Sequence, residues 1–475
     1  MNLAPSPRRL SLRSPVLFGE VLGRPYAHAP SARDALRILT APEAIVLSAA
    51  QKQRSPEGLD REAVAETEAE LLRLGYLQEA PSRPSAPPAP DRVNIWVHLS
   101  NDCNLDCGYC YIKKSRASME AQTLDKLLAS LVQTAESGVE RVHLRFAGGE
   151  PMLRFAALAE FFDRAAQRLS TLGTKLSGAI ITNGTVWPRG AQSWLKERGI
   201  SVSVSMDGPA EVHDRLRPLK RGGGSFARVL AGLDALVAAD LRPYVLITLT
   251  PENLSQLPAL VSLLLERRIA FRMSPVREFE RAASVLEDSG PPELRERMLE
   301  AVFRVYDLVE ADLIARGPWS PGFRFEHKFA DLELWAPLTR ACGAGHNYLA
   351  FGADGQISPC HASLHRPGAP ALDPSRSLLA QAASPLHELR IRRETGNPTC
   401  TECQYRLNCA GGCPLLLLAR GTSAEARSPY CELFRAVMPR LLRVAALELL
   451  LERHPAESPA FARRSLSRAV TLGPA

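Results

Sequence analysis

Short β-rich runs alternate with helical patterns through the middle of the chain, and this alternation constrains the fold more than any other feature of the sequence. The predicted strands are Val93–Ser100, Val142–Phe146, Ala179–Thr182, Ser201–Ser205, Tyr244–Thr250 and Ala270–Pro275. The predicted helices between them are Thr123–Ser137, Phe155–Leu172, Gln192–Arg198, Phe226–Ala239 and Leu254–Arg268. Six β/α units predict an α/β fold over residues 93–300, with a parallel sheet that is open or curled into a partial (β/α)6 barrel. Its active site is expected at the carboxyl ends of the strands.

The composition suits a chain that folds around sizeable cores. Of the 475 residues, 45% are hydrophobic and 23% are charged, which is close to the average of globular proteins. At ~100–200 residues per domain, this length predicts two to four domains. The 58 Lys and Arg against 51 Asp and Glu leave a net charge of +7, and the arginines are dispersed along the chain. We therefore expect no nucleic-acid partner.

Signals for membrane insertion and secretion are both weak. No run approaches the ~18 consecutive apolar residues that a membrane-spanning helix needs. Arginines stand near the N-terminus, but Pro15 and Gly19 interrupt the segment before the apolar core of a signal peptide could form. We expect a soluble, cytoplasmic protein with no membrane partner. In that compartment the ten cysteines indicate metal or redox chemistry rather than structural disulfides.

A small module is predicted ahead of the sheet, at residues 1–80. Thr40-Ala-Pro-Glu43 has the pattern of a capping box with proline in the first turn of a helix. A second helix is predicted over Glu62–Leu74, ended by Gly75 and followed by a short strand at Tyr76-Leu77. This order predicts a winged-helix-like module, and an ordinary helical cap is the alternative. Prolines at positions 81, 84, 87, 88 and 90 predict a semi-rigid linker over residues 81–92.

The first group of cysteines forms a C-x3-C-x2-C loop directly after the first predicted strand. It reads Cys103-Asn-Leu-Asp-Cys107-Gly-Tyr-Cys110. Three thiolates at this spacing can hold three corners of one [4Fe–4S] cluster, and no local side chain is left for the fourth iron. An open iron can bind a substrate or cofactor, whereas a cluster that only transfers electrons has all four positions filled by cysteine. A zinc site is the alternative, and it would need a fourth ligand close by.

This loop resembles the signature of the radical SAM superfamily, C-x3-C-x-aromatic-C, with Tyr109 at the aromatic position. The resemblance continues at the ends of the next three strands, with Gly148-Gly149-Glu150-Pro151, Thr182-Asn183-Gly184 and Ser205-Met206-Asp207-Gly208-Pro209. It implies that S-adenosylmethionine is bound here and that Glu150 receives its amino group. The resemblance gives as cofactor-binding residues Tyr109, Gly148, Gly149, Glu150, Pro151, Thr182, Asn183, Ser205 and Asp207. Any one of these segments alone could be a simple βα turn.

The second group of cysteines resembles the SPASM extension of such enzymes, predicted here over residues 342–440. It reads Cys342-x12-Gly355-x4-Cys360, then Cys400-x2-Cys403-x5-Cys409-x3-Cys413, then Cys431. The resemblance implies two auxiliary clusters, one held by Cys400, Cys403, Cys409 and Cys431 and the other by Cys342, Cys360 and Cys413. With the cluster of Cys103, Cys107 and Cys110 this makes three [4Fe–4S] clusters. The open corner of the three-cysteine cluster takes a substrate group or a non-cysteine ligand, with His346 and His361 as candidates. A zinc knuckle is the alternative for this group.

The resemblance implies that the first cluster, once reduced, cleaves S-adenosylmethionine to a 5′-deoxyadenosyl radical that abstracts a hydrogen from the substrate. Many relatives of this kind modify ribosomally made peptides (RiPPs), and they carry a winged-helix element that captures the leader by pairing it with a sheet edge. The predicted substrate is therefore a precursor peptide, modified by cross-linking of its side chains. The predicted electron donor is a flavodoxin or a ferredoxin. The sequence identifies no catalytic acid or base.

Other functions remain open from the sequence. A sulfatase maturase, which oxidises Cys or Ser to formylglycine, has an aspartate as base after the G-x4-C cysteine, where this chain has His361. The enzyme of pyrroloquinoline quinone synthesis is compatible with the same cysteines. A non-catalytic iron–sulfur redox or scaffold protein would not need the three strand-end segments. The remaining regions are predicted as a helical connector at 301–341 and a C-terminal helix and tail at 441–475.

Overall fold

The structure is a computed structural model, and it describes residues 10–13, 15–79, 90–277, 291–318, 328–338, 340, 342–364, 370–382, 398–421 and 426–453. Most of the predicted linker, at residues 81–89, and the predicted tail after Arg453 lie outside the described residues. No helix in the described ranges is both long and apolar enough to cross a bilayer.

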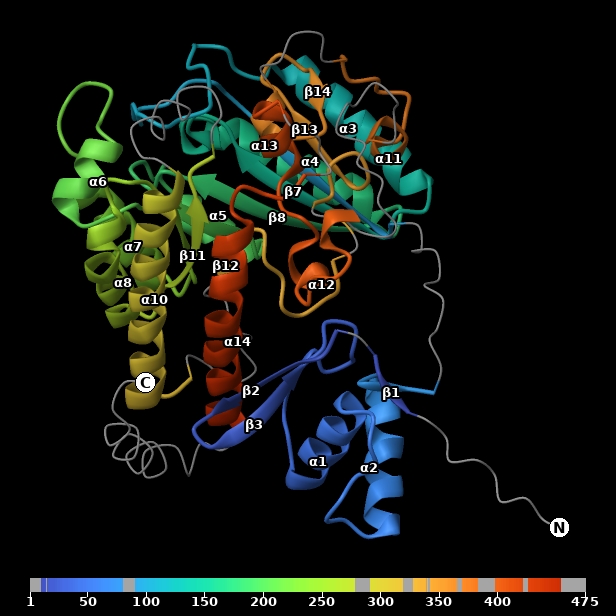
Figure 1. Cartoon of the computed structure of the whole chain (residues 1–475). Coiled ribbons are helices and arrows are strands. Elements are labelled where there is room, and N and C mark those ends of the chain that lie inside the picture. The colour runs from blue at the N-terminus through green and yellow to red at the C-terminus, as the bar shows by residue number, and fades with distance from the viewer. Residues whose placement is uncertain are drawn as a thin grey trace.

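A mostly parallel sheet forms the centre of the molecule, as predicted (Figure 1). Its six core strands lie side by side in chain order: β6 (Arg92–His98), β7 (Arg141–Ala147), β8 (Lys175–Thr182), β9 (Ser201–Ser205), β10 (Tyr244–Leu249) and β11 (Ala270–Pro275). All neighbouring pairs among them are parallel. The six predicted strands are therefore confirmed.

Three further strands extend this sheet at its ends. β12 (Lys328–Phe329) pairs in parallel with β11, at the other edge β13 (Tyr348–Phe351) pairs in parallel with β6, and β14 (Ile357–Ser358) pairs with β13 in an antiparallel hairpin. The sequence analysis missed all three strands. β12 lies in the predicted helical connector, and β13 and β14 lie in the predicted SPASM region. The cysteine-rich part of the chain is thus joined to the main sheet by backbone hydrogen bonds.

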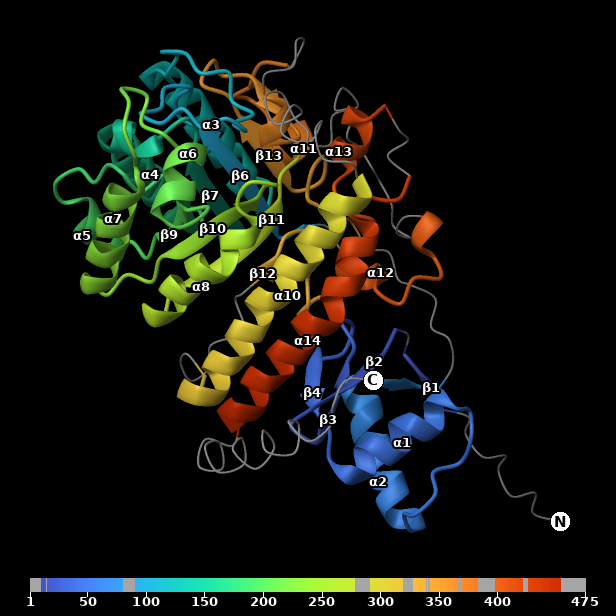
Figure 2. The same ribbon diagram turned by 60° about the vertical axis from the view of Figure 1, so that its left-hand side comes forward.

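Helices cover the outer face of the sheet, and their apolar sides form the main core with it (Figure 2). They are α3 (Ala121–Glu136), η1 (Pro151–Arg154), α4 (Phe155–Ser170), α5 (Ala191–Glu197), α6 (Ala210–Leu216), α7 (Phe226–Ala238), η2 (Leu254–Gln256) and α8 (Leu257–Glu266). Along β7, fully buried side chains alternate with partly exposed ones, and this shows which face of the sheet the helices cover. Val142, Leu144 and Phe146 are fully buried against the helices, whereas Arg145 is half-buried and faces the opposite side.

Two long helices, α10 (Pro291–Arg316) and α14 (Cys431–Arg453), lie side by side next to the sheet (Figure 2). Arg443 of α14 forms an ion pair with Glu310 of α10, with an N–O distance of 2.6 Å. The predicted C-terminal helix is present, and it begins at Cys431. The remaining short elements of the C-terminal region are η4 (His361–Ser363), α11 (Leu378–Ala382), η5 (Pro398–Cys400), α12 (Arg406–Cys409) and α13 (Pro414–Ala419).

The N-terminal module contains both predicted helices and the predicted strand. Its elements are β1 (Ser11–Leu12), β2 (Leu17–Val21), β3 (Arg24–His28), β4 (Leu36–Ile38), α1 (Ala41–Gln51), α2 (Arg61–Leu74) and β5 (Leu77–Gln78). The capping box of α1 is present: the Thr40 amide donates to Glu43 Oε2 at 2.8 Å, and the Glu43 amide donates to Thr40 Oγ1 at 3.4 Å. Gly75 ends α2 with a φ of 86°. The antiparallel sheet β2–β3–β4 was not predicted, and the winged-helix assignment stays a prediction.

This module packs on the rest of the protein (Figure 1). Leu17, Val21 and Tyr26 are buried in the same core as α14, although α1 and α2 enclose a small core of their own. The Arg443 side chain donates to the Glu20 carbonyl at 3.0 Å, and His28 Nε2 lies 2.8 Å from the Leu334 carbonyl. The module is therefore held against the rest of the protein by direct contacts.

Candidate active site

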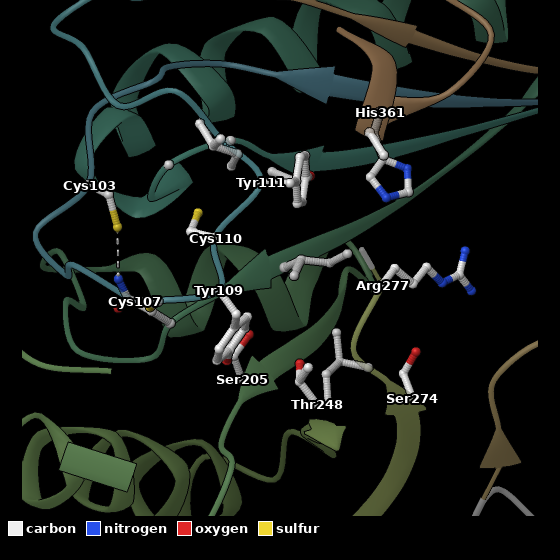
Figure 3. Close-up of a pocket in the computed structure, with 18 of the residues that line it drawn as sticks. Cys103, Cys107, Tyr109, Cys110, Tyr111, Ser205, Thr248, Ser274, Arg277 and His361 are labelled. Carbon is white, nitrogen blue, oxygen red and sulfur yellow. Dashed lines mark hydrogen bonds between the residues drawn. The ribbon is translucent and has the colours of Figure 1, made fainter. Parts of the chain in front are cut away.

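A cavity of about 400 Å³ opens at the carboxyl ends of the central strands, where the sequence predicted an active site. This volume lies within the range of small-molecule and cofactor sites, about 300–1,000 Å³. Figure 3 shows Cys103, Cys107 and Cys110 towards one side of the cavity and His361 and Arg277 towards the other. The predicted residues that line it are Cys103, Cys107, Tyr109, Cys110, Gly148, Gly149, Thr182, Asn183, Ser205, Cys360, His361 and Cys413.

The three cysteines of the first loop have surroundings suited to thiolates. Cys103 and Cys107 are buried and Cys110 is half-buried. The Leu105 amide lies 3.4 Å from Cys103 Sγ, the Asn183 side-chain amide 3.7 Å from the same sulfur, and Arg217 4.0 Å from Cys107 Sγ. Burial raises the pKa of Cys103 to about 11, so iron binding would have to displace the proton. The donor set therefore fits an iron–sulfur cluster that is bound by thiolates.

The turn after β7 lies directly against the start of this loop. The Gly149 amide donates to the Ser100 carbonyl at 2.6 Å, and the Glu150 amide donates to the Asp102 carbonyl at 2.8 Å. A Cβ atom at Gly149 would stand 2.0 Å from the Asp102 oxygen. Gly148 has a φ of 142°, which side chains rarely tolerate. Both glycines are thus required for the close approach that forms this wall of the cavity.

Glu150 is fully buried behind this turn, and it does not line the cavity. Its carboxylate accepts hydrogen bonds from the Met152 amide at 2.9 Å, the Thr182 hydroxyl at 2.7 Å and the Asn183 amide at 2.7 Å. Burial raises the pKa of Glu150 to about 7 despite these donors. The carboxylate links the turns after β7 and β8. A carboxylate has about four acceptor positions, and these three donors leave room for one more. The predicted contact with the cofactor's amino group stays a prediction. Pro151 is buried at the start of η1 and does not line the cavity.

Asp207 orders the turn after β9 and the cysteine loop together. Its carboxylate accepts hydrogen bonds from the Tyr109 hydroxyl, from Arg217 Nε at 2.6 Å and from the Thr248 amide at 2.7 Å. The guanidinium of Arg217 lies 5.4 Å from the centre of the Tyr109 ring. Asp207 is fully buried and does not line the cavity, so it reaches the predicted cofactor site through Tyr109 and Arg217.

The structure brings the second group of cysteines together in two sets. Cys400, Cys403, Cys409 and Cys431 line one small cavity of about 30 Å³. Cys360 and Cys413 line the main cavity, and Cys342 lies close to both: burial, together with the neighbouring Cys413 and Cys342, raises the pKa of Cys360 to about 12. All ten cysteines have free thiols. In the part of the chain that is described, no three His, Cys, Asp or Glu side chains surround one point as the ligands of a single metal ion would. The identity and number of the clusters stay predictions.

His361 lies among aromatic side chains, on the side of the cavity that Cys360 also lines. Its ring stacks on Trp96 with a centroid distance of 4.2 Å, and its Nδ1 lies 2.9 Å from the Tyr348 hydroxyl. Burial, with the charges of Arg277 and Arg145, lowers the pKa of His361 to about 3, so the ring is neutral at pH 7. The other candidate ligand, His346, is half-buried and does not line this cavity.

Sequence reasoning missed several residues of the cavity wall. Arg145 and Arg272 project from β7 and β11, and Arg217 and Arg277 follow β9 and β11 in the chain. A signal was available, because arginine is rare at the buried positions of a predicted central strand. Trp96 and Tyr111 also line the cavity. Trp96 lies within the first predicted strand, and Tyr111 directly follows Cys110.

Residues 97–264 match the radical SAM superfamily. The match begins in β6, includes the cysteine loop and the turns after β7, β8 and β9, and ends in α8. Residues 97–264 are a radical SAM domain. The protein is therefore an enzyme, and a radical SAM domain implies the use of an iron–sulfur cluster. That the loop of Cys103, Cys107 and Cys110 holds this cluster stays a prediction.

Known proteins resemble the chain over more than this domain. It is 25% identical over 347 residues to the serine-type anaerobic sulfatase-maturating enzyme of Klebsiella aerogenes, covering 68% of this chain and 79% of that enzyme. The structure of native anSMEcpe with bound AdoMet and a Cp18Cys peptide has a TM-score of 0.60 and 17% identity, covering 74% of this chain and 99% of that one. Streptococcus suis SuiB bound to precursor peptide SuiA has a TM-score of 0.53 and 17% identity, covering 88% and 98%. At these identities the two structures show a shared fold.

Proposed function

We propose that the protein is a radical S-adenosylmethionine maturase that modifies, by cross-linking, the side chains of a ribosomally synthesised precursor peptide. The observation that carries the proposal is a single cavity lined by the three-cysteine loop, by the glycines after β7 and by Cys360 and Cys413 of the second cysteine group. In this arrangement the site that generates the radical lies opposite the second cluster site. The space between them is large enough for a side chain. Two solved structures of the same fold contain bound peptides, which supports a peptide substrate.

In this proposal the cofactors are S-adenosylmethionine and three [4Fe–4S] clusters, and a flavodoxin or ferredoxin in the cytoplasm supplies electrons. Once bound and reduced, the first cluster and S-adenosylmethionine supply a 5′-deoxyadenosyl radical. The residues of the chain position the cysteine loop and shield the cavity from water. Gly148 and Gly149 let the turn after β7 approach the backbone of Ser100 and Asp102 at the start of the cysteine loop, and Tyr109 and Arg217 hold that loop through Asp207. Trp96, Tyr111 and His361 exclude water from the opposite wall.

The first experiment measures iron and cofactor cleavage. Anaerobically reconstituted protein should contain about twelve iron atoms, because each of three clusters holds four. After reduction it should convert S-adenosylmethionine to 5′-deoxyadenosine. Replacing Cys103, Cys107 and Cys110 together by Ala should remove about a third of the iron and all cleavage. Replacing Cys400, Cys403 and Cys409 together should remove a different third and leave slow uncoupled cleavage. Stoichiometric zinc with little iron would contradict the proposal.

The leader of the peptide is proposed to bind the N-terminal module, by pairing with an edge of the sheet β2–β3–β4. Deleting the module would expose the apolar face of α14 that Leu17 and Val21 cover, so truncation would disturb the catalytic part as well. The better test keeps the enzyme intact. A precursor peptide with its leader should be modified at low concentration, whereas the same core without the leader should need a much higher concentration. Equal modification of both peptides would contradict leader recognition.

Formylglycine formation is the second candidate, favoured by the likeness to the sulfatase-maturating enzyme. His361 replaces the aspartate expected in that class, and its pKa of about 3 leaves it neutral. Oxidising Ser to formylglycine removes the same two hydrogens as forming a cross-link, so intact mass alone does not separate the reactions. An aldehyde-reactive hydrazide should leave a cross-linked product unlabelled, and labelling of the product would favour formylglycine.

A further inference from the structure

The side of the cavity next to His361 carries an excess of positive charge. Arg145, Arg272 and Arg277 all line it, and the charges of all three act on His361. No carboxylate is among the described residues that line the cavity. Asp331 lies behind this side and pairs with Arg277 at 2.7 Å. Arg277 also lies near Cys413 and Cys360, and its anionic partner is Asp331.

In the described parts of the chain, Arg145 and Arg272 have no ion pair of their own, and the carboxylate that acts on Arg272 is Asp331, which already pairs with Arg277. Arg145 adds its positive charge to the surroundings of Arg272. Burial is the larger effect, and it lowers the pKa of Arg272 below its ordinary value. A guanidinium nevertheless stays protonated in proteins. Two cations that face one cavity without an ion pair of their own among the described residues carry a desolvation cost, and an entering anion relieves it.

The two arginines belong to the wall opposite the cysteine loop. The cations that act on Cys107 are Arg217 and Lys114, whereas those that act on His361 are Arg277, Arg145 and Arg272. Figure 3 shows the same separation, with Arg277 and His361 away from Cys103 and Tyr111 between the two sides. The cations near the cysteine loop, Arg217 and Lys114, are therefore distinct from those beside His361.

We propose that Arg145 and Arg272 bind a carboxylate of the peptide core, so that the residue presented for modification is acidic or lies beside an acidic group. This inference rests on the proposed peptide substrate and names its class. Arginine suits the role because its planar fork can donate two hydrogen bonds to one carboxylate. Trp96 and Tyr111 flank the site, and their aromatic rings exclude water that would screen the pair.

The test compares a carboxylate with its isosteric amide on the reconstituted full-length protein. The probes are N-acetyl-glutamate N-methylamide and N-acetyl-glutamine N-methylamide, titrated by ligand-detected NMR with S-adenosylmethionine present. The glutamate probe should bind roughly ten- to a hundredfold more tightly, as expected for charge-assisted hydrogen bonds. This preference should disappear in Arg145→Gln and in Arg272→Gln, remain in part in Arg272→Lys, and be unchanged in Arg304→Gln on the exposed face of α10. The same comparison of N-acetyl-alanine with its N-methylamide measures whether the site also binds a C-terminal carboxylate.

Three results would overturn the inference. Equal binding of acid and amide by the wild type would exclude a carboxylate site. Weaker binding of S-adenosylmethionine by the glutamine variants would assign the arginines to the cofactor, and loss of iron would assign them to an auxiliary cluster. Failure of the proposed function is distinguishable, because it would leave the carboxylate preference intact while no peptide is modified.

Discussion

Glu150 joins the turns after β7 and β8, and its substitution separates its role in connecting them from its proposed role in binding the cofactor. Glu150→Gln keeps the shape but removes the charge, and its amide N–H groups would oppose the Asn183 amide or the Thr182 hydroxyl. If the carboxylate also receives the cofactor's ammonium, a charge-assisted hydrogen bond of about 1.5–3 kcal/mol is lost. We expect roughly ten- to a hundredfold weaker binding of S-adenosylmethionine, measured by equilibrium dialysis, with iron content unchanged.

Glu160→Gln is the matched control, because this glutamate lies exposed on α4. It should leave cofactor affinity unaltered. If Glu150→Gln binds the cofactor as the wild type does, the carboxylate serves only to connect the two turns.

At the scale of the element, the turn after β7 and the cysteine loop act as one unit. A Cβ at position 149 would stand 2.0 Å from the backbone oxygen of Asp102, which cannot rotate away as a side chain could. Gly149→Ala must therefore shift one of the two segments, at a cost of about 1–3 kcal/mol for overpacking. We expect this variant to lose about a third of its iron, measured after anaerobic reconstitution, because the first cluster site is distorted.

Gly108→Ala tests the same loop without this clash. Its Cβ would meet no atom within 4 Å, and Gly108 is exposed. Full iron content is expected there. A Gly149→Ala protein that also keeps all its iron would show that the close approach is not needed to bind the first cluster.

At the scale of the whole molecule, His28 of β3 connects the N-terminal module to the segment after β12. The residue is fully buried, its Nε2 lies 2.8 Å from the Leu334 carbonyl, and its Nδ1 has no hydrogen-bond partner among the described residues. Burial lowers the pKa of His28 to about 4, below its unfolded value of about 6.5. The unfolded state therefore binds the extra proton first, so stability is lost as the pH falls from 6.5 towards 4. At pH 5 the loss is about 2 kcal/mol.

This prediction is measured by urea unfolding at pH 7 and pH 5. His28→Gln cannot titrate, so the wild type should lose about 2 kcal/mol more than this variant between the two pH values. The other buried histidines are common to both proteins and cancel in the difference. The same pH dependence in both proteins would show that His28 becomes protonated without disturbing the module.

The sequence by itself determined the parallel sheet and the position of the first cysteine loop. Strand and helix periodicities are local, and the six core strands each contain enough residues to show them. Cys103 follows the first strand directly, so its place at the carboxyl edge of the sheet was also fixed locally. The helices α1 and α2 were likewise identified from their capping residues, Thr40 and Gly75.

Only the tertiary structure decided which side chains share the cavity. β12, β13 and β14 contain two to four residues each, too few for a periodic pattern, and they form because the edges of the sheet offer hydrogen-bond partners from distant parts of the chain. Asp207 lies behind the cavity wall, where Tyr109, Arg217 and the Thr248 amide donate to its oxygens, and its contact with the cofactor stays a prediction. Arg145 and Arg272 lie 127 positions apart in the sequence, and only the order of strands places them on one wall beside His361. Charge complementarity depends on such long-range neighbours, and no local pattern contains them.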